Sequence, residues 1–113
     1  MRAMALLLPG ALMSAAALAQ YTPSAARQHE LVRLVRQDCG SCHGMRLTGG
    51  LGPALTRDVL AERSPKSVAA TIFHGRPGTP MPPWRSMLSE SEAAWIAEQL
   101  VAGFPTEGQE GVR

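Results

Sequence analysis

Five consecutive residues, Cys39-Gly40-Ser41-Cys42-His43, have types and a spacing that could do chemistry. C-x-x-C-H is the spacing at which two thiols bond covalently to the vinyl groups of a haem, and the histidine that follows becomes an iron ligand. Two residues between the cysteines let one turn of backbone present both sulfurs to neighbouring edges of a porphyrin. We therefore expect one haem c per chain, attached through Cys39 and Cys42, with His43 as the first axial ligand.

Two other uses of these cysteines are open at this point. A dithiol oxidoreductase would need strands around the C-x-x-C, and the chain has no alternating run of β-branched residues; this function also gives His43 no role. A zinc site would combine Cys39, Cys42, His43 and His74, but the adjacent Cys42 and His43 cannot easily share one tetrahedron.

The residue that fills the second face of the iron decides between electron transfer and chemistry on a substrate. Met81 is the best-placed ligand, because it lies far beyond His43 in a segment that Pro80, Pro82 and Pro83 make stiff. A thioether binds iron weakly, and a rigid loop lowers the entropic cost of holding it at bonding distance. We expect His43 and Met81 to be the two metal ligands.

Other methionines and histidines are weaker candidates for the second face. Met45 is too close to His43 to cross the ring, and Met87 is expected to pack in the core. His29 is expected to be solvated. His74 ends the helix ahead of the Met81 loop, where a cation is favoured, but an imidazole there could replace the sulfur if the loop opened. This replacement is a hypothesis from sequence position alone.

The first nineteen residues have the pattern of a secretory signal: a positive start, a short apolar core interrupted by Pro9-Gly10, and an A-x-A exit at Ala17–Ala19. We expect residues 1–19 to be a cleaved signal peptide and residues 20–113 to be one domain that carries a single haem, with no permanent membrane anchor. Haem is attached to such cysteines outside the cytoplasmic membrane, so we expect a periplasmic protein.

Composition limits the other functions. The formal net charge of the whole chain is +2, which provides no basic field for nucleic acid. Both cysteines lie in the motif, so thioether bonds would leave none for a structural disulfide. A domain of this size buries a limited core, and we expect the porphyrin to complete it.

The elements that must position these residues are predicted to be helices. Apolar periodicity and caps indicate a helix over residues 24–37 that runs into the cysteines, one over 65–74, and one ending at 102 after the capping box Ser89-Glu90-Ser91-Glu92. In the first of these helices, we expect Leu31, Leu34 and Val35 to form the stripe that faces the core. Thr56 begins a short turn through Leu60. Loops rich in glycine (48–53) and proline (76–84) lie between the helices, and we expect a flexible tail from about residue 104. The fold class is all-α, with three main helices.

The order of these features resembles that of the class I monohaem cytochromes c. The chain has a helix, Cys39-x-x-Cys42-His43, a Gly52-Pro53 loop, a helix, a Met81-Pro82 loop and a last helix with an aromatic residue. The resemblance implies the class I cytochrome c fold. It also implies that the Pro53 carbonyl accepts a hydrogen bond from the proximal imidazole, a role that adds Pro53 to the cofactor-binding residues.

Three segments are similar to the small cytochrome c-55X (NirC) group that accompanies the cd1-type nitrite reductase of denitrifying bacteria. They are DCGSCHGM at 38–45, GGLGPAL at 49–55 and GRPGTPMPPW at 75–84. The resemblance implies an electron carrier, not an enzyme, with that reductase and an upstream electron donor as partners. Two alternatives stay open: a factor in haem d1 maturation or cofactor transfer, and a haem protein whose sixth site opens to a small ligand. We expect a monomer.

Overall fold

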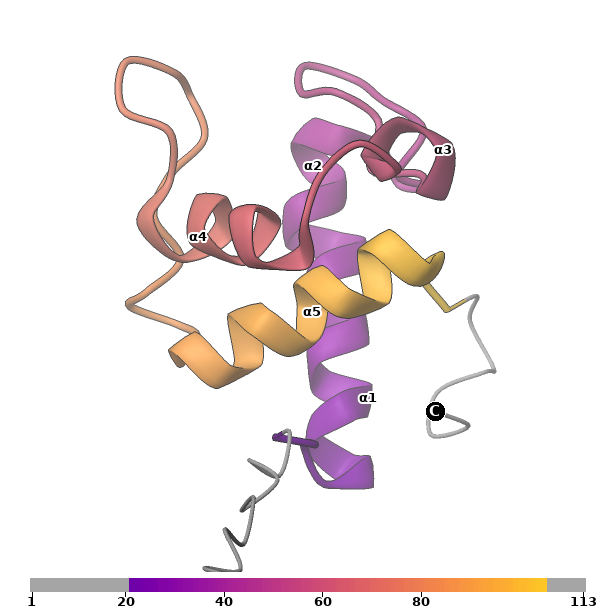
Figure 1. Ribbon diagram of the computed structural model, residues 1–113, viewed down its shortest axis with the longest axis vertical. Helices are drawn as coiled ribbons and strands as arrows, with labels where there is room; N and C mark the ends of the chain where they lie inside the picture. The colour runs from indigo at the N-terminus through magenta and orange to yellow at the C-terminus, as the bar shows by residue number, and fades with distance from the viewer. Residues whose placement is uncertain (1–20, 106–113) are drawn as a thin grey trace, which may run out of the picture.

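The structure is a computed structural model that describes residues 21–105. These residues form helices and loops, with no strand among them (Figure 1). The expected signal peptide, residues 1–19, and the tail beyond Pro105 lie outside the described residues. Of the helices within 21–105, none is long and apolar enough to cross a membrane.

The first helix is a continuous rod of three segments that ends at the C-x-x-C-H motif. It comprises α1 (Ala25–Leu34), a π-helical turn η1 (Val35–Cys39) and α2 (Gly40–His43). Ser24 caps its start by accepting a hydrogen bond from the Arg27 amide at 3.2 Å. Gly44 ends it with φ +89°, where glycine avoids the steric cost of a Cβ. The helix thus carries both cysteines and His43 as its last turn.

The remaining helices begin and end where the sequence predicts. They are α3 (Arg57–Leu60), α4 (Pro65–His74) and α5 (Glu90–Ala102). Ser64 caps α4 through the Ser67 amide, and Pro65 occupies its first turn. The capping box of α5 is complete, because Ser89 and Glu92 each bond the other's backbone amide.

One apolar core joins the helices within residues 21–105. From the first helix it takes Leu31, Val32 and Val35, which are at most 1% exposed. Helix α5 packs along α4 and also contacts α3. Burying each large side chain contributes about 1.5–3 kcal/mol. The members of the core from the other segments are Leu47, Leu60, Val68, Ile72, Leu88, Ala93, Trp95, Ile96, Ala97 and Leu100.

The face by which α1 meets this core is rotated slightly from the sequence-based expectation. Val32 is buried, whereas Leu34, which was expected in the packed stripe, is only partly buried. The stripe therefore follows Gln28, Leu31, Val32 and Val35. This set has the i, i+3, i+4, i+7 spacing of one helix face, so Leu34 falls at its edge.

A salt bridge connects the N-terminal part of α1 with the N-terminal part of α5. The Arg27 guanidinium donates from Nε and Nη2 to the two carboxylate oxygens of Glu92, both at 3.0 Å. Arg27 also contacts Glu30 at 2.7 Å. Hydrogen bonds from Arg27 hold the pKa of the Glu92 carboxyl below its usual value. The pair therefore fixes the crossing of α1 and α5 at their N-terminal ends.

Candidate functional site

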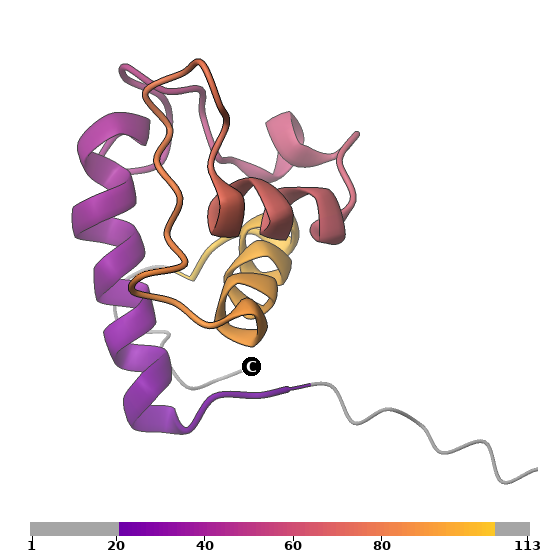
Figure 2. The same cartoon turned by 90° about the vertical axis from the view of Figure 1, so that its left-hand side faces the viewer.

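Three segments meet at one end of the molecule. Helix α2 ends there, the loop of residues 44–56 turns there, and the loop of residues 75–88 rises to the same end from α4 (Figures 1 and 2). Each carries predicted site residues: the cysteines and His43, then Pro53, then Met81. The fold thus brings to one end residues that are far apart in the sequence.

The two cysteines lie one helical turn apart and are not bonded to each other. Cys39 is partly buried against the core, and Cys42 is exposed. Burial raises the pKa of the Cys39 thiol to about 11, with a smaller contribution from Asp38. A redox dithiol depends on a lowered thiol pKa, so this environment does not favour the oxidoreductase alternative.

The imidazole of His43 is oriented by the loop that follows it. His43 Nδ1 lies 2.7 Å from the carbonyl oxygen of Pro53, which is the contact that the family resemblance implied. Because a carbonyl only accepts, Nδ1 donates, and Nε2 carries the available lone pair. Nε2 makes no hydrogen bond to any residue within 21–105, so the ring presents a metal-binding nitrogen.

Gly52 packs directly on this ring, a contact that sequence analysis missed. A Cβ at Gly52 would lie 2.8 Å from both Cε1 and Nδ1 of His43. A Cβ at Gly50 would lie just as close, 2.8 Å, to the carbonyl oxygen of Cys42. Residues without a Cβ let the backbone come close to a neighbouring group, and here the neighbouring group is the C-x-x-C-H motif itself. The three glycines just before Pro53 indicate in the sequence that the backbone passes close to another group. Which group it passes depends on how the loop folds.

The loop that carries Met81 is braced by hydrogen bonds as well as by prolines. The Arg76 amide donates to the Met81 carbonyl at 3.2 Å, and the Thr79 hydroxyl donates to the Arg76 carbonyl at 2.6 Å. The Met81 amide donates to the Thr79 hydroxyl at 3.3 Å. Trp84 then ties the loop back to α4 through its amide and the Ile72 carbonyl, at 3.0 Å. Thr79 is therefore a positioning residue that the sequence did not single out.

Gly75 is the pivot of the same loop. Its φ of +71° lies in the region that favours glycine. A Cβ there would meet Pro83 N at 2.7 Å and the Met81 carbonyl oxygen at 2.9 Å. The returning part of the loop, at Met81 to Pro83, therefore passes so close to the end of α4 that only glycine fits at position 75.

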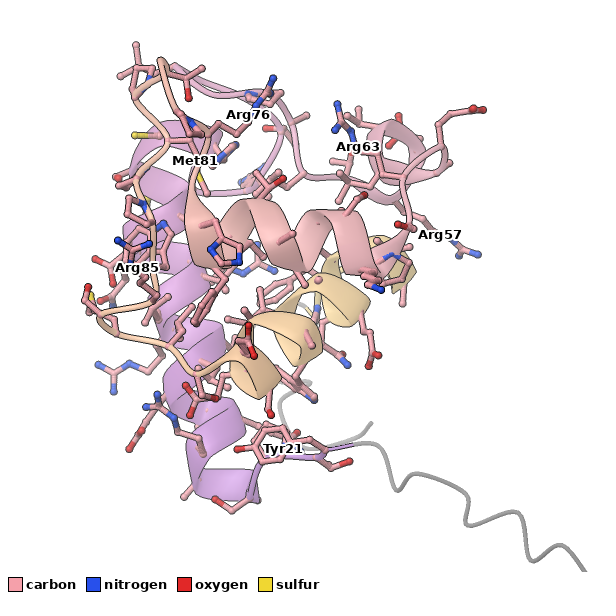
Figure 3. All side chains as sticks on the ribbon, turned by 60° about the vertical axis from the view of Figure 1, so that its left-hand side comes forward. Tyr21, Arg57, Arg63, Arg76, Met81 and Arg85 are labelled. Carbon is pink, nitrogen blue, oxygen red and sulfur yellow. The ribbon has the colours of Figure 1, made fainter. Side chains whose placement is uncertain are left out.

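The competing ligands lie in different environments. Met81 is partly buried in the loop (Figure 3), whereas Met45 and Met87 are 63% and 56% exposed. The expectation that Met87 packs in the core is therefore wrong. His29 is exposed, and so is His74, which stacks edge-on with Phe73 at a ring-centroid distance of 5.0 Å.

The residues present fit a covalent haem. Two free thiols one turn apart, an imidazole with an available Nε2 and a thioether on a braced loop make a donor set for iron and porphyrin vinyl groups. The part of the chain that the structure describes contains no group of three or more His, Cys, Asp or Glu side chains that could hold a metal ion. Those residues therefore offer no ligand set for the zinc alternative.

Comparisons with known proteins agree with this geometry. The profile of the cytochrome c oxidase, cbb3-type, subunit III family matches residues 26–99. A cytochrome c55X of Pseudomonas aeruginosa is 55% identical over 86 residues, which cover 76% of this chain and 72% of the relative. The solved structure of a c-type cytochrome NirC aligns with a TM-score of 0.69 at 54% identity, over 71% of this chain and 94% of that one.

A larger protein contains a similar region. The dihydro-heme d1 dehydrogenase of Pseudomonas aeruginosa is 36% identical over 76 residues, which span 67% of this chain but 15% of that protein. The helical fold, the C-x-x-C-H turn and the extended similarity to small cytochromes lead to one conclusion. The chain belongs to the cytochrome c55X (NirC) family of c-type cytochromes, and it has their class I cytochrome c fold.

Proposed function

We propose that this protein is a one-electron carrier with one haem c, attached covalently through Cys39 and Cys42 and ligated by His43 and Met81. The observation that carries the proposal is the 2.7 Å hydrogen bond between His43 Nδ1 and the Pro53 carbonyl. That bond selects the tautomer in which Nε2 can bind iron, and it makes the imidazole a stronger donor.

The haem supplies an iron centre that exchanges one electron between its ferric and ferrous states. The chain's own residues keep the surroundings the same in both states. Pro53 and Gly52 hold the imidazole of His43 in place, and the Arg76 and Thr79 contacts hold the backbone of Met81. Methionine favours the ferrous state relative to a second histidine. Phe73 and Trp84, which are partly buried against the core, would help to exclude water from a haem bound beside them.

We infer the role in denitrification from the cytochrome c55X family. The carrier would receive electrons from an upstream donor and pass them to a cd1-type nitrite reductase in the periplasm, after removal of residues 1–19. It would act as a monomer without a permanent membrane anchor. The exposed Ser41 and Cys42 would form part of the docking edge. Such transient redox encounters use small interfaces.

Absorption spectra of the purified, exported protein test the ligands. Wild type should show a covalent low-spin c-type haem, with a sulfur-to-iron charge-transfer band when oxidised. Met81→Ala should lose this band, whereas Met87→Ala, which removes an exposed methionine from the same region, should keep it. A high-spin wild-type spectrum, or a band that survives in Met81→Ala, would contradict the assignment of Met81.

Electron delivery itself is tested separately. The reduced protein should be oxidised rapidly by a cd1-type nitrite reductase in stopped-flow mixing, and the reaction should require the intact haem. Intact-mass measurement of the exported protein should give a chain that begins at Gln20 and carries one haem. No electron transfer to the reductase, despite a normal spectrum, would leave a carrier with a different partner.

Haem d1 maturation is the second candidate function, and one observation favours it. The similarity to part of a dihydro-heme d1 dehydrogenase shows that a domain of this kind occurs within a protein with that name. If this chain acts in maturation, its loss should lower the haem d1 content of the reductase. If it acts only in delivery, the reductase should contain its full complement of haem d1 but turn over slowly.

The third candidate is a haem protein whose sixth site opens. It predicts that the resting protein binds nitric oxide or carbon monoxide, because the Met81 bond would be labile or absent. A carrier should resist both ligands. If Met81→Ala binds a second nitrogen ligand in place of sulfur, and a further His74→Ala change abolishes this, His74 is the replacement ligand.

A further inference from the structure

The described structure has a hollow on a different part of the surface from the predicted iron ligands. Its volume is about 680 Å³, and none of the cysteines, His43 or Met81 lines it. Arg57, at the start of α3, lies well away from Met81 (Figure 3). The residues that line the hollow are Arg36, Met45, Arg46, Leu47, Leu55, Thr56, Arg57, Gly103 and Phe104.

The charge of this hollow is positive. Three of its lining side chains are arginines, and none of the lining residues within 21–105 is acidic. Both salt bridges found within residues 21–105 belong to Arg27, so no carboxylate from that part of the chain pairs with Arg36, Arg46 or Arg57. The hollow therefore presents three guanidinium groups that have no ion-pair partner among the described residues.

The guanidinium of Arg36 is fixed by two contacts, yet one of its N–H donors has no hydrogen-bond partner within residues 21–105. Its Nη2 donates to the Pro105 carbonyl, and its guanidinium lies over the Phe104 ring at 5.2 Å. Its Nε is buried and has no hydrogen-bond partner among the described residues. A buried donor without an acceptor is costly, so an acceptor that enters this hollow would be stabilised there.

The floor of the hollow is apolar. Leu47 is only 2% exposed, and Leu55 and Phe104 are partly buried against the core. A floor of this kind contacts carbon atoms, while the guanidinium forks match the paired oxygens of carboxylate or phosphate groups. A hollow of this volume is in the range of small-molecule sites, which is about 300–1,000 Å³.

We propose that the hollow between Arg36, Arg46 and Arg57 binds a small organic polyanion. Its carboxylate or phosphate groups pair with the guanidiniums, one of them accepting from Arg36 Nε, and its apolar body lies on Leu47, Leu55 and Phe104. The site is separate from the predicted iron ligands, so the bound anion adds negative charge beside the helix that carries them. This inference does not rest on the proposed electron-transfer partner.

The test uses the exported holoprotein, so that the haem carboxylates are already in their final positions. Pyromellitate, a benzene ring with four carboxylates, is titrated while amide chemical shifts are followed by NMR. Shifts should cluster at residues 45–47, 55–57 and 103–104. Pyrophosphate, which has charge without an apolar body, should bind at least about tenfold more weakly, the factor that a modest apolar contact supplies.

Charge variants identify the arginines. Arg46→Gln and Arg57→Gln change exposed side chains, so the fold should be retained, and each should weaken pyromellitate binding about tenfold. Arg33→Gln removes an exposed arginine of α1 outside the hollow and should change the affinity less than about twofold. Arg36→Gln should have the largest effect, provided that circular dichroism shows the same helix content.

Three outcomes would overturn the proposal. They are the absence of saturable binding to the holoprotein, equal affinity for pyrophosphate, and an equal loss in Arg33→Gln.

Discussion

At the residue scale, His43 is constrained from two directions. The Pro53 carbonyl fixes which ring nitrogen carries the proton, and the backbone at Gly52 lies against the ring face. An imidazole held in this way could not rotate freely when a bound iron changed its oxidation state. In the haem site that we propose, the Gly52-Pro53 pair would therefore act on the metal through His43.

This contact makes Gly52→Ala a specific test. The new Cβ would lie 2.8 Å from the His43 ring, so the ring or the loop must shift. Overpacking of this kind costs about 1–3 kcal/mol. We expect a lower unfolding midpoint in denaturant and a partly high-spin absorption spectrum.

Gly40→Ala is the matched control for that substitution. A Cβ at Gly40 would lie 3.4 Å from its nearest neighbour, an ordinary contact, and the residue lies between the two cysteines. It should keep the low-spin spectrum, and its stability should change by less than about 1 kcal/mol. Equal spectral changes in both variants would show that the Gly52 contact is not special.

At the element scale, the π-helical turn Val35–Cys39 sets how the attachment motif follows α1. The Gly40 amide donates to the Val35 carbonyl, five residues back instead of four, so one residue bulges outward. Because the bulge takes up one residue, side chains before and after it point in the directions they would have in a regular α-helix that lacked that residue. The bulge thus adds a residue without rotating the motif away from the loop at residues 44–56.

Single-residue deletions test this interpretation. Deletion of the exposed Gln37 should convert η1 to α-helix and retain haem attachment, measured as the ratio of haem to protein. Deletion of the exposed Arg33, inside α1, should rotate the Leu31 and Val32 face by about 100° relative to the motif and lower that ratio strongly. Equal losses from both deletions would contradict the role given to η1.

The Arg27–Glu92 pair makes the crossing of α1 and α5 dependent on pH. The hydrogen bonds from Arg27 lower the pKa of Glu92 from its usual 4.5. The contribution of Glu92 to stability is therefore complete above pH 4.5 and is lost as the pH falls through the lowered folded-state pKa. We expect about 1 kcal/mol from this partly exposed pair.

Urea unfolding of wild type and Glu92→Gln, at neutral pH and well below pH 4.5, measures this contribution. Glutamine keeps one oxygen that can complete the capping box, so the substitution removes the charge and one of the two oxygens that accept from Arg27. The two proteins should differ at neutral pH and converge in acid. Glu90→Gln, which changes an exposed carboxylate two residues away in the same first turn, should follow wild type at both pH values.

At the scale of the whole molecule, the described core is small for independent stability. It is one cluster of helical side chains, and the end that carries α2 and the two loops is built mostly from backbone turns. Small domains bury too little surface to be stable without an added staple. The haem would supply the missing apolar surface and join α2 to the loop at Met81.

Removal of the haem should therefore unfold much of the chain. A variant produced without residues 1–19, so that it stays in the cytoplasm, should lack covalent haem. It should show weak helical circular dichroism and no cooperative thermal transition, in contrast to the exported holoprotein. A haem-free chain with full helix content and a sharp transition would show that the core is sufficient on its own.

The sequence by itself determined the elements and their chemistry. Ser64 with Pro65, the Ser89 to Glu92 capping box and Gly103 mark helix ends through local backbone bonds, and the structure keeps them. Cys39, Cys42 and His43 sit within one turn, so their spacing is also a local property. Similarity to the cytochrome c55X family confirms the predicted family and fold.

Tertiary structure decided what depends on segments distant in the sequence. That Gly52 meets the His43 ring, that Thr79 braces Met81, and that Arg36, Arg46 and Arg57 share one hollow follow from loop paths. No local periodicity encodes these paths, because backbone hydrogen bonds between turns and a few glycine conformations set them. The C-x-x-C-H motif could therefore be identified from the sequence, whereas the contacts that position His43 and Met81 could be identified only from the tertiary structure.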